Sequence, residues 1–484
     1  MPKTYYVTTS IPYANANPHI GFAMELIQAD VLARYARQQG HEVIFSTGTD
    51  EHGSKIYEKA QETGVDPRTL TDEMSQTFRS LSDMIDISNN RFIRTTDEKH
   101  EAGAQKIWKK LEKDIYKSTY EGLYCVGCEE FVTATTAKEN NNTCPIHQKP
   151  YQSLKEENYF FRLSKYGEQI QKAIEDNSFE LLPASRRNEI LRMVEGGLDD
   201  ISVSRPSDKL PWGVPVPGDE KQVMYVWFEA LMNYITVLDF PDGDDFATYW
   251  PADVQVIGKD IIRFHTTIWP AMLLAIGVDL PKKLYIHGFI SIKNQKISKS
   301  IGNVVHPQDV IDIFGVDPLR YYLLRHIPSS SDGDFTWQAL HDAYTNELAN
   351  DLGNAVQRTA VMVHKYLDGS VDDTSPTAHD TGAYYEALKN CQFDRALEEV
   401  WKQARGLNQY IDEQQPWQVA KQGDAEHLKQ ILQHQVASML QIAELLEPFL
   451  PHTAKRIQEV FNASVIQPPE TTLFPRVETD ILPS

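Results

Sequence analysis

The sequence predicts an α/β protein with a doubly wound parallel sheet, split by an insertion and followed by an all-α helical bundle. Two observations predict the sheet: β-branched and aromatic runs alternate with helical patterns over residues 1–114, and they do so again over residues 225–290. A third observation predicts the bundle, because helical periodicity without strands continues from about residue 341 to residue 461. Residues 115–222 then form the insertion.

The first half of the sheet begins with a predicted strand over residues 5–9, a loop over 11–18, a helix over about 21–39 and a strand over 42–46. The second strand leads into Thr49-Asp50-Glu51-His52-Gly53. Strand–helix units of this length form parallel, Rossmann-like sheets, which bind ligands beyond the carboxyl ends of their strands. We therefore expect the loop before the helix and the loop that contains Asp50 to face one ligand.

Two short motifs indicate a split phosphate site. Pro18-His19-Ile20-Gly21 precedes a helix, whose N-terminal N–H groups and dipole favour an anion, and Gly21 leaves room for close approach. Lys296-Ile297-Ser298-Lys299-Ser300 lies in a window, residues 280–308, that holds five lysines and no Asp or Glu. Ammonium groups there can stabilise charge that develops on phosphoryl oxygens. The plainer alternatives are a histidine that caps a helix and a solvated lysine-rich loop.

The second half predicts a strand over residues 253–257, a helix to about residue 276 and a strand over 284–290. Its helical segments carry aromatic and imidazole side chains on two faces. One face consists of Trp227, Ala230, Leu231 and Tyr234, and the other of Ile261, His265 and Trp269. Such faces usually pack into a core, but they can instead wall an apolar pocket for a small molecule. The spacing alone leaves both interpretations open.

The insertion contains two pairs of candidate metal ligands, Cys125-x-x-Cys128 and Cys144-Pro-Ile-His147, with fifteen residues between them (144 − 128 − 1). Three thiolates and one imidazole complete a tetrahedral zinc site and leave no position for substrate. We therefore expect a structural zinc knuckle at about residues 120–155. The alternative is a loop with unligated thiols. Cys391, in a helical stretch, is expected to be a buried apolar residue.

The composition limits the classes of protein to which the chain can belong. Its 484 residues, 41% of them hydrophobic, suffice for about two to four domains. No basic-then-apolar segment opens the chain and no stretch approaches the ~18 apolar residues of a membrane span, so we expect a cytoplasmic protein. The net charge of −21 argues against non-specific binding of nucleic acid.

The helical bundle is acidic, because residues 345–484 hold eleven Lys and Arg against twenty Asp and Glu. Any contact with RNA there must therefore read unpaired bases by hydrogen bonding and stacking. Candidates are Asn354 and Arg358, one helical turn apart, and Trp417, which follows Pro416 at a helix start. The alternative for Trp417 is a packing aromatic at the entry of a helix.

The ordered motifs resemble those of a known family. Tyr13-Ala14-Asn15 with Pro18-His19-Ile20-Gly21 is similar to the HIGH motif region of the class I aminoacyl-tRNA synthetases, and Lys296-Ile297-Ser298-Lys299-Ser300 is similar to their KMSKS loop. A narrower resemblance, to the methionyl-tRNA synthetases, covers nearly the whole chain. It rests on Ile11-Pro12-Tyr13-Ala14-Asn15, Thr49-Asp50-Glu51-His52-Gly53, Tyr225-Val226-Trp227, Gly258-Lys259-Asp260 and Asp412-Glu413-Gln414-Gln415-Pro416-Trp417.

The resemblance implies an ATP-dependent ligase that forms methionyl-adenylate and transfers methionine to tRNA(Met), with Mg²⁺ accompanying ATP and one structural Zn²⁺ per chain. It implies catalytic roles for His19, Lys296 and Lys299, and ATP contacts from Gly21, Glu25, Gly258, Asp260 and Lys299. Asp50 would meet the methionine ammonium and Arg205 its carboxylate. The thioether pocket would consist of Ile11, Tyr13, Trp227, Ala230, Leu231, Tyr234, Ile261, His265 and Trp269. Anticodon contacts would fall on Asn354, Arg358 and Trp417, and zinc ligation on Cys125, Cys128, Cys144 and His147.

The resemblance also implies five parts: a first catalytic half (1–114), a connective insertion with the zinc knuckle (115–222), a second catalytic half (223–284), a KMSKS-loop region (285–340) and an α-helical anticodon-binding domain (341–484). Two positions depart from the family motifs, because Phe22 replaces the second HIGH histidine and Ile297 replaces the KMSKS methionine. The chain ends soon after the helical domain, so we expect a monomer.

Two rival functions follow from the same residues. The first is a class I synthetase for another amino acid. An enzyme for valine, leucine or isoleucine would carry a large editing insertion, for which the segment between the halves is too short. A cysteine enzyme would use its zinc to bind substrate, whereas the predicted Cys₃His set is closed. A non-catalytic RNA-binding relative is the rival from another class, and Phe22 is its only indication.

Overall fold

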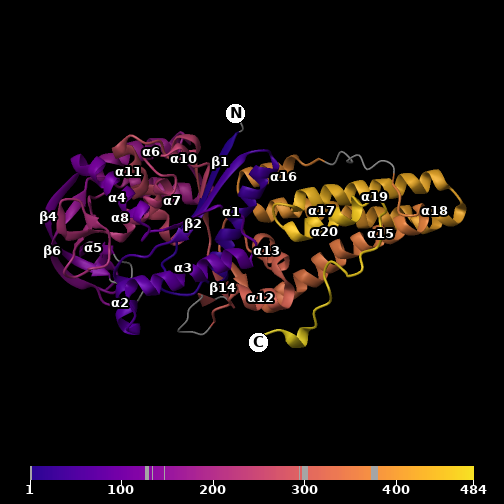
Figure 1. Cartoon of the computed structure of the whole chain (residues 1–484), viewed down its shortest axis with the longest axis horizontal. Coiled ribbons are helices and arrows are strands. Elements are labelled where there is room, and N and C mark those ends of the chain that lie inside the picture. Colours follow the sequence, from indigo (N-terminus) through magenta and orange to yellow (C-terminus); the bar gives the residue numbers. More distant parts are fainter. Residues whose placement is uncertain are drawn as a thin grey trace. The chain divides into compact units, whose positions relative to one another are not determined.

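A computed structural model gives the structure of this chain and describes residues 3–125, 130–132, 134–146, 148–293, 295–296, 303–371 and 380–483 (Figure 1). The chain forms two compact units. The first consists of Met1–Pro18, His41–Ser82 and Asn89–Ile286, and the second of His19–Gly40, Asp83–Ser88 and His287–Ser484. Within the described residues, no helix is long and apolar enough to cross a membrane.

A six-stranded parallel sheet forms the centre of the first unit, in the order β3-β2-β1-β12-β13-β7. Its strands are β1 (Thr4–Thr9), β2 (Glu42–Thr49), β3 (Arg91–Arg94), β7 (Glu180–Leu182), β12 (Val254–Gly258) and β13 (Lys283–His287). In β1, Val7 pairs with Phe45 of β2 on one side and with Val254 of β12 on the other. The apolar runs seen in the sequence follow from this central position, since a parallel strand is covered on both faces. The predicted parallel sheet is confirmed.

One predicted strand was wrong. Residues 284–290 do not form a single strand, because β13 ends at His287 and a separate strand, β14 (Ile290–Ile292), joins a different sheet. The break falls at Gly288, where a Cβ atom would lie 2.3 Å from the Ser331 carbonyl oxygen. Only glycine permits so close an approach of another backbone. The edge strand β7 was not predicted either, since it comes from within the insertion.

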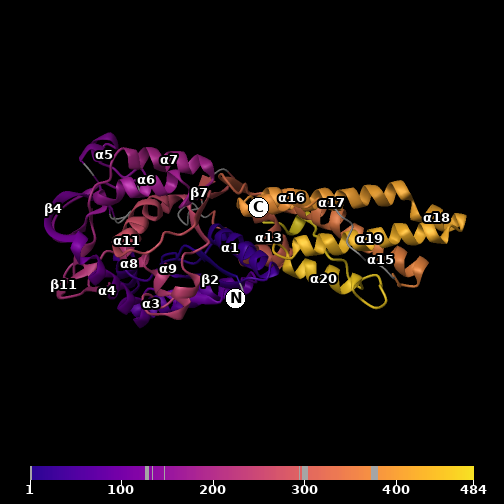
Figure 2. The same cartoon turned by 90° about the horizontal axis from the view of Figure 1, so that it is seen from above.

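The insertion adds two antiparallel sheets to the first unit, in the orders β5-β4-β6-β8 and β10-β11-β9. Their strands are β4 (Ile115–Cys125), β5 (Glu130–Val132), β6 (Gln152–Phe161), β8 (Ile201–Ser202), β9 (Ser204–Pro206), β10 (Pro215–Val216) and β11 (Asp219–Met224). The α-helices of the whole first unit are α2 (Ser54–Thr63), α3 (Pro67–Met84), which ends in the second unit, α4 (Glu98–Leu111), α5 (Ala134–Glu139), α6 (Gly167–Glu175), α7 (Ala184–Glu195), α8 (Val226–Ala230), α9 (Asn233–Thr236), α10 (Asp244–Tyr249) and α11 (Trp269–Ile276). Figure 2 shows α6 and α7 lying side by side.

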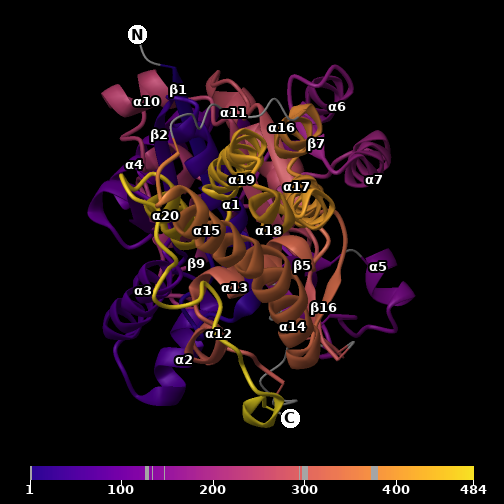
Figure 3. The same ribbon diagram turned by 90° about the vertical axis from the view of Figure 1, so that its right-hand side faces the viewer.

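The second unit is mainly helical, which confirms the predicted helical region. Figure 3 turns α15, α17, α19 and α20 toward the viewer, and α19 packs against each of the other three. The helices are α1 (Ile20–Gln38), α12 (Pro307–Phe314), α13 (Val316–Arg325), α14 (Trp337–Ala343), α15 (Asn354–Leu367), α16 (Gly382–Lys389), α17 (Phe393–Gln414), α18 (Pro416–Gln422), α19 (Ala425–Leu446) and α20 (Pro451–Phe461). A π-helix (Tyr344–Gly353) joins α14 to α15, and a small sheet contains β14, β15 (Gln295–Lys296) and β16 (Gly333–Phe335).

The helical periodicity predicted for about residues 341–461, which includes the stretches 384–410 and 426–461, is interrupted within both of these stretches. The stretch 384–410 breaks at Cys391, which is buried as expected but adopts φ 53° in a turn rather than a helical conformation. The stretch 426–461 breaks between α19 and α20, around Pro448 and Pro451. Proline lacks the N–H that a helix interior needs and restricts the residue before it, so a helix ends there and a new one begins.

Candidate active site

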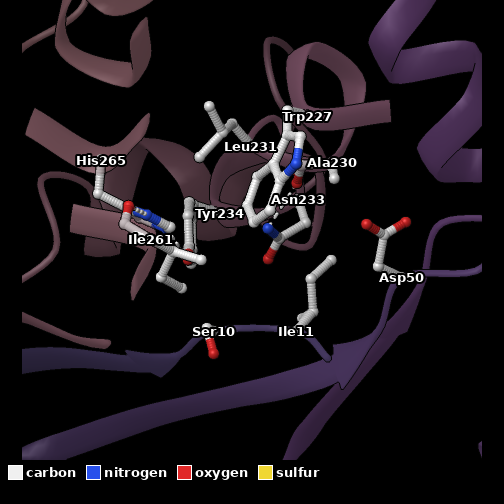
Figure 4. A pocket seen from close by; sticks show the side chains of 10 residues that line it. All are labelled: Ser10, Ile11, Asp50, Trp227, Ala230, Leu231, Asn233, Tyr234, Ile261 and His265. Atoms are coloured by element: carbon white, nitrogen blue, oxygen red, sulfur yellow. Dashed lines mark hydrogen bonds between the residues drawn. The ribbon is translucent and has the colours of Figure 1, made fainter. Parts of the chain in front are cut away.

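A pocket in the first unit lies at the carboxyl ends of three neighbouring strands, β2, β1 and β12. Its empty space, open mouth included, amounts to about 260 Å³. Its lining consists of Ser10, Ile11, Asp50, Trp227, Ala230, Leu231, Asn233, Tyr234, Ile261 and His265 (Figure 4). Both predicted helical faces therefore contribute to one cavity.

The strand ends form one wall of the pocket. Ser10 and Ile11 follow β1 directly, and Asp50 follows β2. The Ala14 N–H donates to the Asp50 carbonyl at 2.9 Å and the Asp50 N–H donates to the Pro12 carbonyl at 2.9 Å, so the two loops are joined by their backbones. The Asp50 side chain is only 3% exposed, which keeps a carboxylate in a largely desolvated position. A charge held there attracts a cation strongly.

Two short helices, α8 and α9, form the opposite wall, with a turn at Leu231 and Met232 in place of the single helix that the sequence predicted. The Asn233 side-chain amide donates to the Ala230 carbonyl at 2.6 Å, which closes this turn. Asn233 and Ser10 also line the pocket, although neither was predicted from the sequence. Asn233 could have been found, because it lies three residues after Ala230, the spacing that places two residues on one face of a predicted helix.

The Tyr234 hydroxyl lies 2.7 Å from His265 Nε2, and both side chains are buried. His265 Nδ1 lies 3.0 Å from the Ile261 carbonyl, an acceptor, so Nδ1 carries the hydrogen of a neutral imidazole. Nε2 is then an acceptor, and Tyr234 donates to it. In Figure 4 this pair stands on the opposite side of the pocket from Asp50, with Trp227 and Ile11 between them.

Aromatic rings extend the wall beyond the ten lining residues. Trp227 stacks on Phe264 with ring centroids 4.0 Å apart, and the Tyr13 ring meets Trp227 edge-on at 6.0 Å. Tyr13 and Trp269 were both expected in the pocket, but the structure has them next to it rather than in its lining. Trp269 is buried, contacts the Tyr234 ring at 5.7 Å and donates its N–H to Gln255 at 3.2 Å.

His19 is the N-cap of α1 in the second unit. Its Nδ1 accepts from the Gly21 N–H at 3.0 Å, so its Nε2 carries the ring hydrogen. A Cβ atom on Gly21 would lie 2.8 Å from the His19 ring, so glycine is what allows the ring to fold over the helix start. His19 therefore caps α1 in the structure, and its contact with a phosphate stays a prediction.

The first N–H groups of α1 were expected to bind an anion, but they have partners in the chain. Ile20 donates to the Val305 carbonyl at 3.3 Å, while Phe22 and Ala23 donate to the His19 carbonyl at 3.0 and 3.2 Å. The helix can thus offer an anion its dipole and the His19 ring rather than unoccupied N–H groups.

Glu25, one turn further along α1, is 4% exposed and forms an ion pair with His287 at 2.9 Å. His287 Nδ1 lies 2.8 Å from the Gly288 carbonyl, so both of its nitrogens face acceptors. The contact with His287 fixes the direction of the Glu25 side chain.

Comparison with known proteins adds the deciding observation. Residues 5–360 match the family model described as tRNA synthetases class I (M). The chain is 43% identical to the methionine–tRNA ligase of Caldanaerobacter subterraneus subsp. tengcongensis over 475 residues, 95% of this chain and 74% of that protein. It is 40% identical to the methionine–tRNA ligase of Thermotoga maritima over 94% of this chain and 74% of that protein.

The chain belongs to the class I methionine–tRNA ligases. Its structure agrees, because it superposes on the Mycobacterium tuberculosis methionyl-tRNA synthetase in complex with methionyl-adenylate with a TM-score of 0.89, at 36% identity over 98% of this chain and 100% of that one. The apo form of the same protein gives a TM-score of 0.84 at 33% identity, over 99% of each chain. The resemblance inferred from the motifs and the predicted methionine–tRNA ligase activity are confirmed, and the rival synthetases are excluded.

Other residues expected of a methionine–tRNA ligase lie apart from the pocket lining. Gly258 ends β12 and is buried, and Asp260 follows it in an exposed 3-10 turn. Arg205 is 8% exposed, and its Nη1 donates to the Ser204 carbonyl at 2.7 Å. Lys299 and the Lys296 side chain lie outside the described residues.

The lysine-rich window is less positive than its sequence suggested. Lys282 pairs with Asp253 at 2.7 Å and Lys283 with Glu180 at 3.4 Å, so carboxylates from elsewhere in the first unit offset two of its five charges. Counting charges along the chain could not reveal these partners, because both lie more than twenty-five residues away in sequence.

Half of the predicted zinc set can be located. Cys125 at the end of β4 and Cys144 after α5 are 3% and 2% exposed, whereas Cys128 and His147 lie outside the described residues. Among the residues that the structure does describe, no group of three or more His, Cys, Asp or Glu side chains is arranged to hold a metal ion. Two buried cysteines suit a thiolate-bound metal, so the donor types fit zinc, but the site stays a prediction.

The three expected anticodon residues all belong to the helical second unit. Asn354 and Arg358 lie on the first turns of α15, and Trp417 lies at the start of α18, which packs against α15. Asn354 is exposed, Arg358 and Trp417 are half-buried, and Arg358 donates to Asp412 at 2.6 Å. Their role in reading a tRNA stays a prediction.

Proposed function

We propose that the pocket binds methionine with its ammonium group at Asp50 and its thioether beside Tyr234 and His265. The observation that carries this proposal is the separation of a buried carboxylate from a Tyr–His pair across a cavity whose middle is apolar (Figure 4). A carboxylate complements an ammonium group, and Trp227 and Ile11 can enclose a flexible, polarisable side chain. The M. tuberculosis relative was solved in complex with methionyl-adenylate, which supports a site for methionine in a protein of this fold.

In the first step, the methionine carboxylate attacks the α-phosphorus of ATP, an acyl–phosphate bond forms, and the bond to pyrophosphate breaks. His19 donates its Nε2–H to the phosphates, while the ammonium groups of Lys296 and Lys299 offset the charge on the leaving pyrophosphate. Mg²⁺ bound to ATP would offset further phosphate charge. Gly21, Glu25, Gly258 and Asp260 hold the nucleotide, with Glu25 fixed by His287.

In the second step, a ribose hydroxyl at the 3′ end of tRNA(Met) attacks the adenylate carbonyl, and AMP leaves. The energy comes from the mixed anhydride, so no protein nucleophile is needed. Asn354, Arg358 and Trp417 select the tRNA by hydrogen bonding to and stacking on unpaired anticodon bases. Their cluster on α15 and α18 supports this role.

Methionine-dependent exchange between ATP and pyrophosphate tests the pocket. Asp50→Asn keeps the shape of the side chain but removes its charge, so we expect the methionine KM to rise ~100-fold while the ATP KM stays within about twofold. Lys299→Ala should instead lower kcat for adenylate formation and leave tRNA binding unchanged. An Asp50→Asn enzyme with the wild-type methionine KM would remove the basis of the proposal.

The division of the chain by function is also proposed here: catalytic halves at 1–114 and 223–284, the connective insertion at 115–222, the KMSKS-loop region at 285–340 and the anticodon-binding domain at 341–484. Cys125, Cys128, Cys144 and His147 would hold a structural zinc ion, which would fasten the outer part of the insertion. We further propose that the enzyme acts as a monomer, which its mass in solution would test.

A further inference from the structure

A buried polar cluster lies in the first unit, outside the residues that line the pocket. Glu229 is fully buried between two histidines: its Oε1 is 3.0 Å from His52 Nδ1 and its Oε2 is 2.8 Å from His100 Nε2. The two histidines are 4% and 0% exposed. The other nitrogen of His100, Nδ1, lies 2.8 Å from the Thr236 hydroxyl. We call these four residues the Glu229 cluster.

The Glu229 cluster joins the elements that carry the pocket. His52 lies two residues after Asp50, Glu229 lies between Trp227 and Ala230 on α8, and Thr236 ends α9, which carries Asn233 and Tyr234. The remaining member, His100, belongs to α4, which contributes no lining residue. One carboxylate thus fixes the position of the Asp50 loop relative to the two helices of the opposite wall.

Helix α4 is the support against which these elements are held. It packs closely on α9, because a Cβ atom at Gly103 would lie 2.7 Å from Thr236 Cγ2. Only a residue without a side chain permits this approach, which brings His100, one turn earlier on α4, within hydrogen-bonding distance of Thr236. The geometry of the Glu229 cluster therefore depends on the close packing of α4 against α9 and on the contacts of the Glu229 carboxylate with the two histidines.

Charge complementarity keeps the Glu229 carboxylate ionised. Burial alone would raise the pKa of Glu229, but the charge of His52 and the hydrogen bonds from both histidines outweigh it, and the pKa lies below its usual value. Glu101 approaches His52 Nε2 at 3.8 Å from α4, and burial raises the pKa of Glu101 despite the opposing charges of His52 and Arg68. A buried carboxylate of this kind is stable only while its partners stay in place.

We propose that Glu229 is a positioning residue for methionine: through His52 and His100 it sets the distance between Asp50, which receives the ammonium, and the helices that receive the thioether. This proposal rests on the proposed function of the pocket. Because ATP contacts come from other parts of the chain, loss of the Glu229 charge should weaken methionine binding selectively. We expect a rise of about tenfold or more in the methionine KM with the ATP KM and kcat within about threefold.

The test compares Glu229→Gln with Asp114→Asn in ATP–pyrophosphate exchange and thermal unfolding. Asp114 is the matched control, because it is also a buried carboxylate (1% exposed) that bonds to two side chains, Lys165 at 2.6 Å and Tyr166 at 2.7 Å. Neither of these partners lines the pocket. Both variants should lower Tm, but only Glu229→Gln should raise the methionine KM. A methionine KM within twofold of wild type, or an equal rise in both KM values, would overturn the proposal.

If Glu229→Gln does not fold, Thr236→Val decides the question, since it removes only the hydroxyl that contacts His100. A rise of about threefold in the methionine KM supports the proposal, and an unchanged value refutes it. Asp50→Asn separates this inference from the function on which it rests. An effect of Asp50→Asn without one of Glu229→Gln defeats the positioning role alone, whereas no effect of Asp50→Asn defeats the assignment of the pocket itself.

Discussion

The Asp30 carboxylate and the Arg320 guanidinium form a fully buried ion pair at 2.7 Å in the second unit. Arg34 approaches the same carboxylate at 2.7 Å, and Ser88 donates to it through its backbone and its hydroxyl. Arg320 in turn donates to the Phe449 carbonyl at 2.8 Å, just before α20. Helix α1 is thereby fixed to α13 and to the segment just before α20, within one unit.

Asp30→Asn should destabilise the chain by about 3–5 kcal/mol, because Arg320 would keep its charge in a buried position with no carboxylate. Urea unfolding measures this loss. Lys455 and Glu459 form an exposed pair at 3.8 Å, so Glu459→Gln is the control and should change little. Equal stability of the two variants would show that the buried pair contributes nothing.

The same pair predicts how stability depends on pH. Burial alone would raise the pKa of Asp30, but Arg320, Arg34 and Ser88 outweigh it, so the folded-state pKa lies below the usual value. A depressed pKa contributes stability that is complete above the unfolded value of ~3.9 and is lost as the pH falls through the folded value. Wild type should therefore lose stability below about pH 4, and Asp30→Asn should lack that part of the loss. If the free energy of unfolding fell equally in the two proteins as the pH was lowered, this prediction would be contradicted.

Tyr234→Phe should reduce discrimination between methionine and norleucine, which differ only in the thioether sulfur. The substitution removes the hydroxyl and leaves His265 Nε2 without its donor at 2.7 Å. We expect the ratio of kcat/KM for the two amino acids to fall about tenfold, equivalent to ~1.4 kcal/mol. Tyr166→Phe is the control, because Tyr166 donates to Asp114 and lines no part of the pocket. An unchanged ratio in Tyr234→Phe would mean that the hydroxyl does not sense sulfur.

Gly21→Ala should slow adenylate formation by about 100-fold, since the new Cβ would lie 2.8 Å from the His19 ring and displace its Nε2 from the phosphates. The methionine KM should stay unchanged. Gly406→Ala provides the contrast: its Cβ would meet no atom within 4 Å, so the helix propensity of alanine should stabilise α17 by about 0.5–1 kcal/mol with full activity. Full activity of Gly21→Ala would show that the ring can move without cost.

The sequence was sufficient for features that follow from local pattern. Alternating strand and helix periods predicted the parallel sheet, and the rule that ligands bind at the carboxyl ends of its strands brought Asp50 and Ile11 to one site. Spacing on a helix predicted that Trp227 and Tyr234 share a face, and both line the pocket. The motifs then supplied the family that the comparisons confirmed.

Long-range polar partners could not be predicted in this way. Arg320 is 290 residues from Asp30, and Glu229 is 177 and 129 residues from His52 and His100. No local pattern marks such pairs, because only the folded chain brings the partners together. The close approach of Ser331 to Gly288, which ends β13, depends on tertiary packing for the same reason.

Arg358→Gln should impair tRNA charging and spare amino-acid activation. Arg358 is half-buried on α15 and donates to the exposed carboxylate of Asp412 at 2.6 Å, so the pair holds the guanidinium in one direction at the end of the bundle that also carries Trp417. Loss of a charged hydrogen-bond donor to an unpaired base should lower kcat/KM for tRNA(Met) about 10- to 100-fold, while methionine-dependent pyrophosphate exchange stays at the wild-type rate. Asp412→Asn separates recognition from orientation: it keeps the donor but weakens its partner, so its effect on charging should be smaller than that of Arg358→Gln. If both substitutions lowered pyrophosphate exchange as much as charging, the defect would lie in folding and the anticodon role of Arg358 would be rejected.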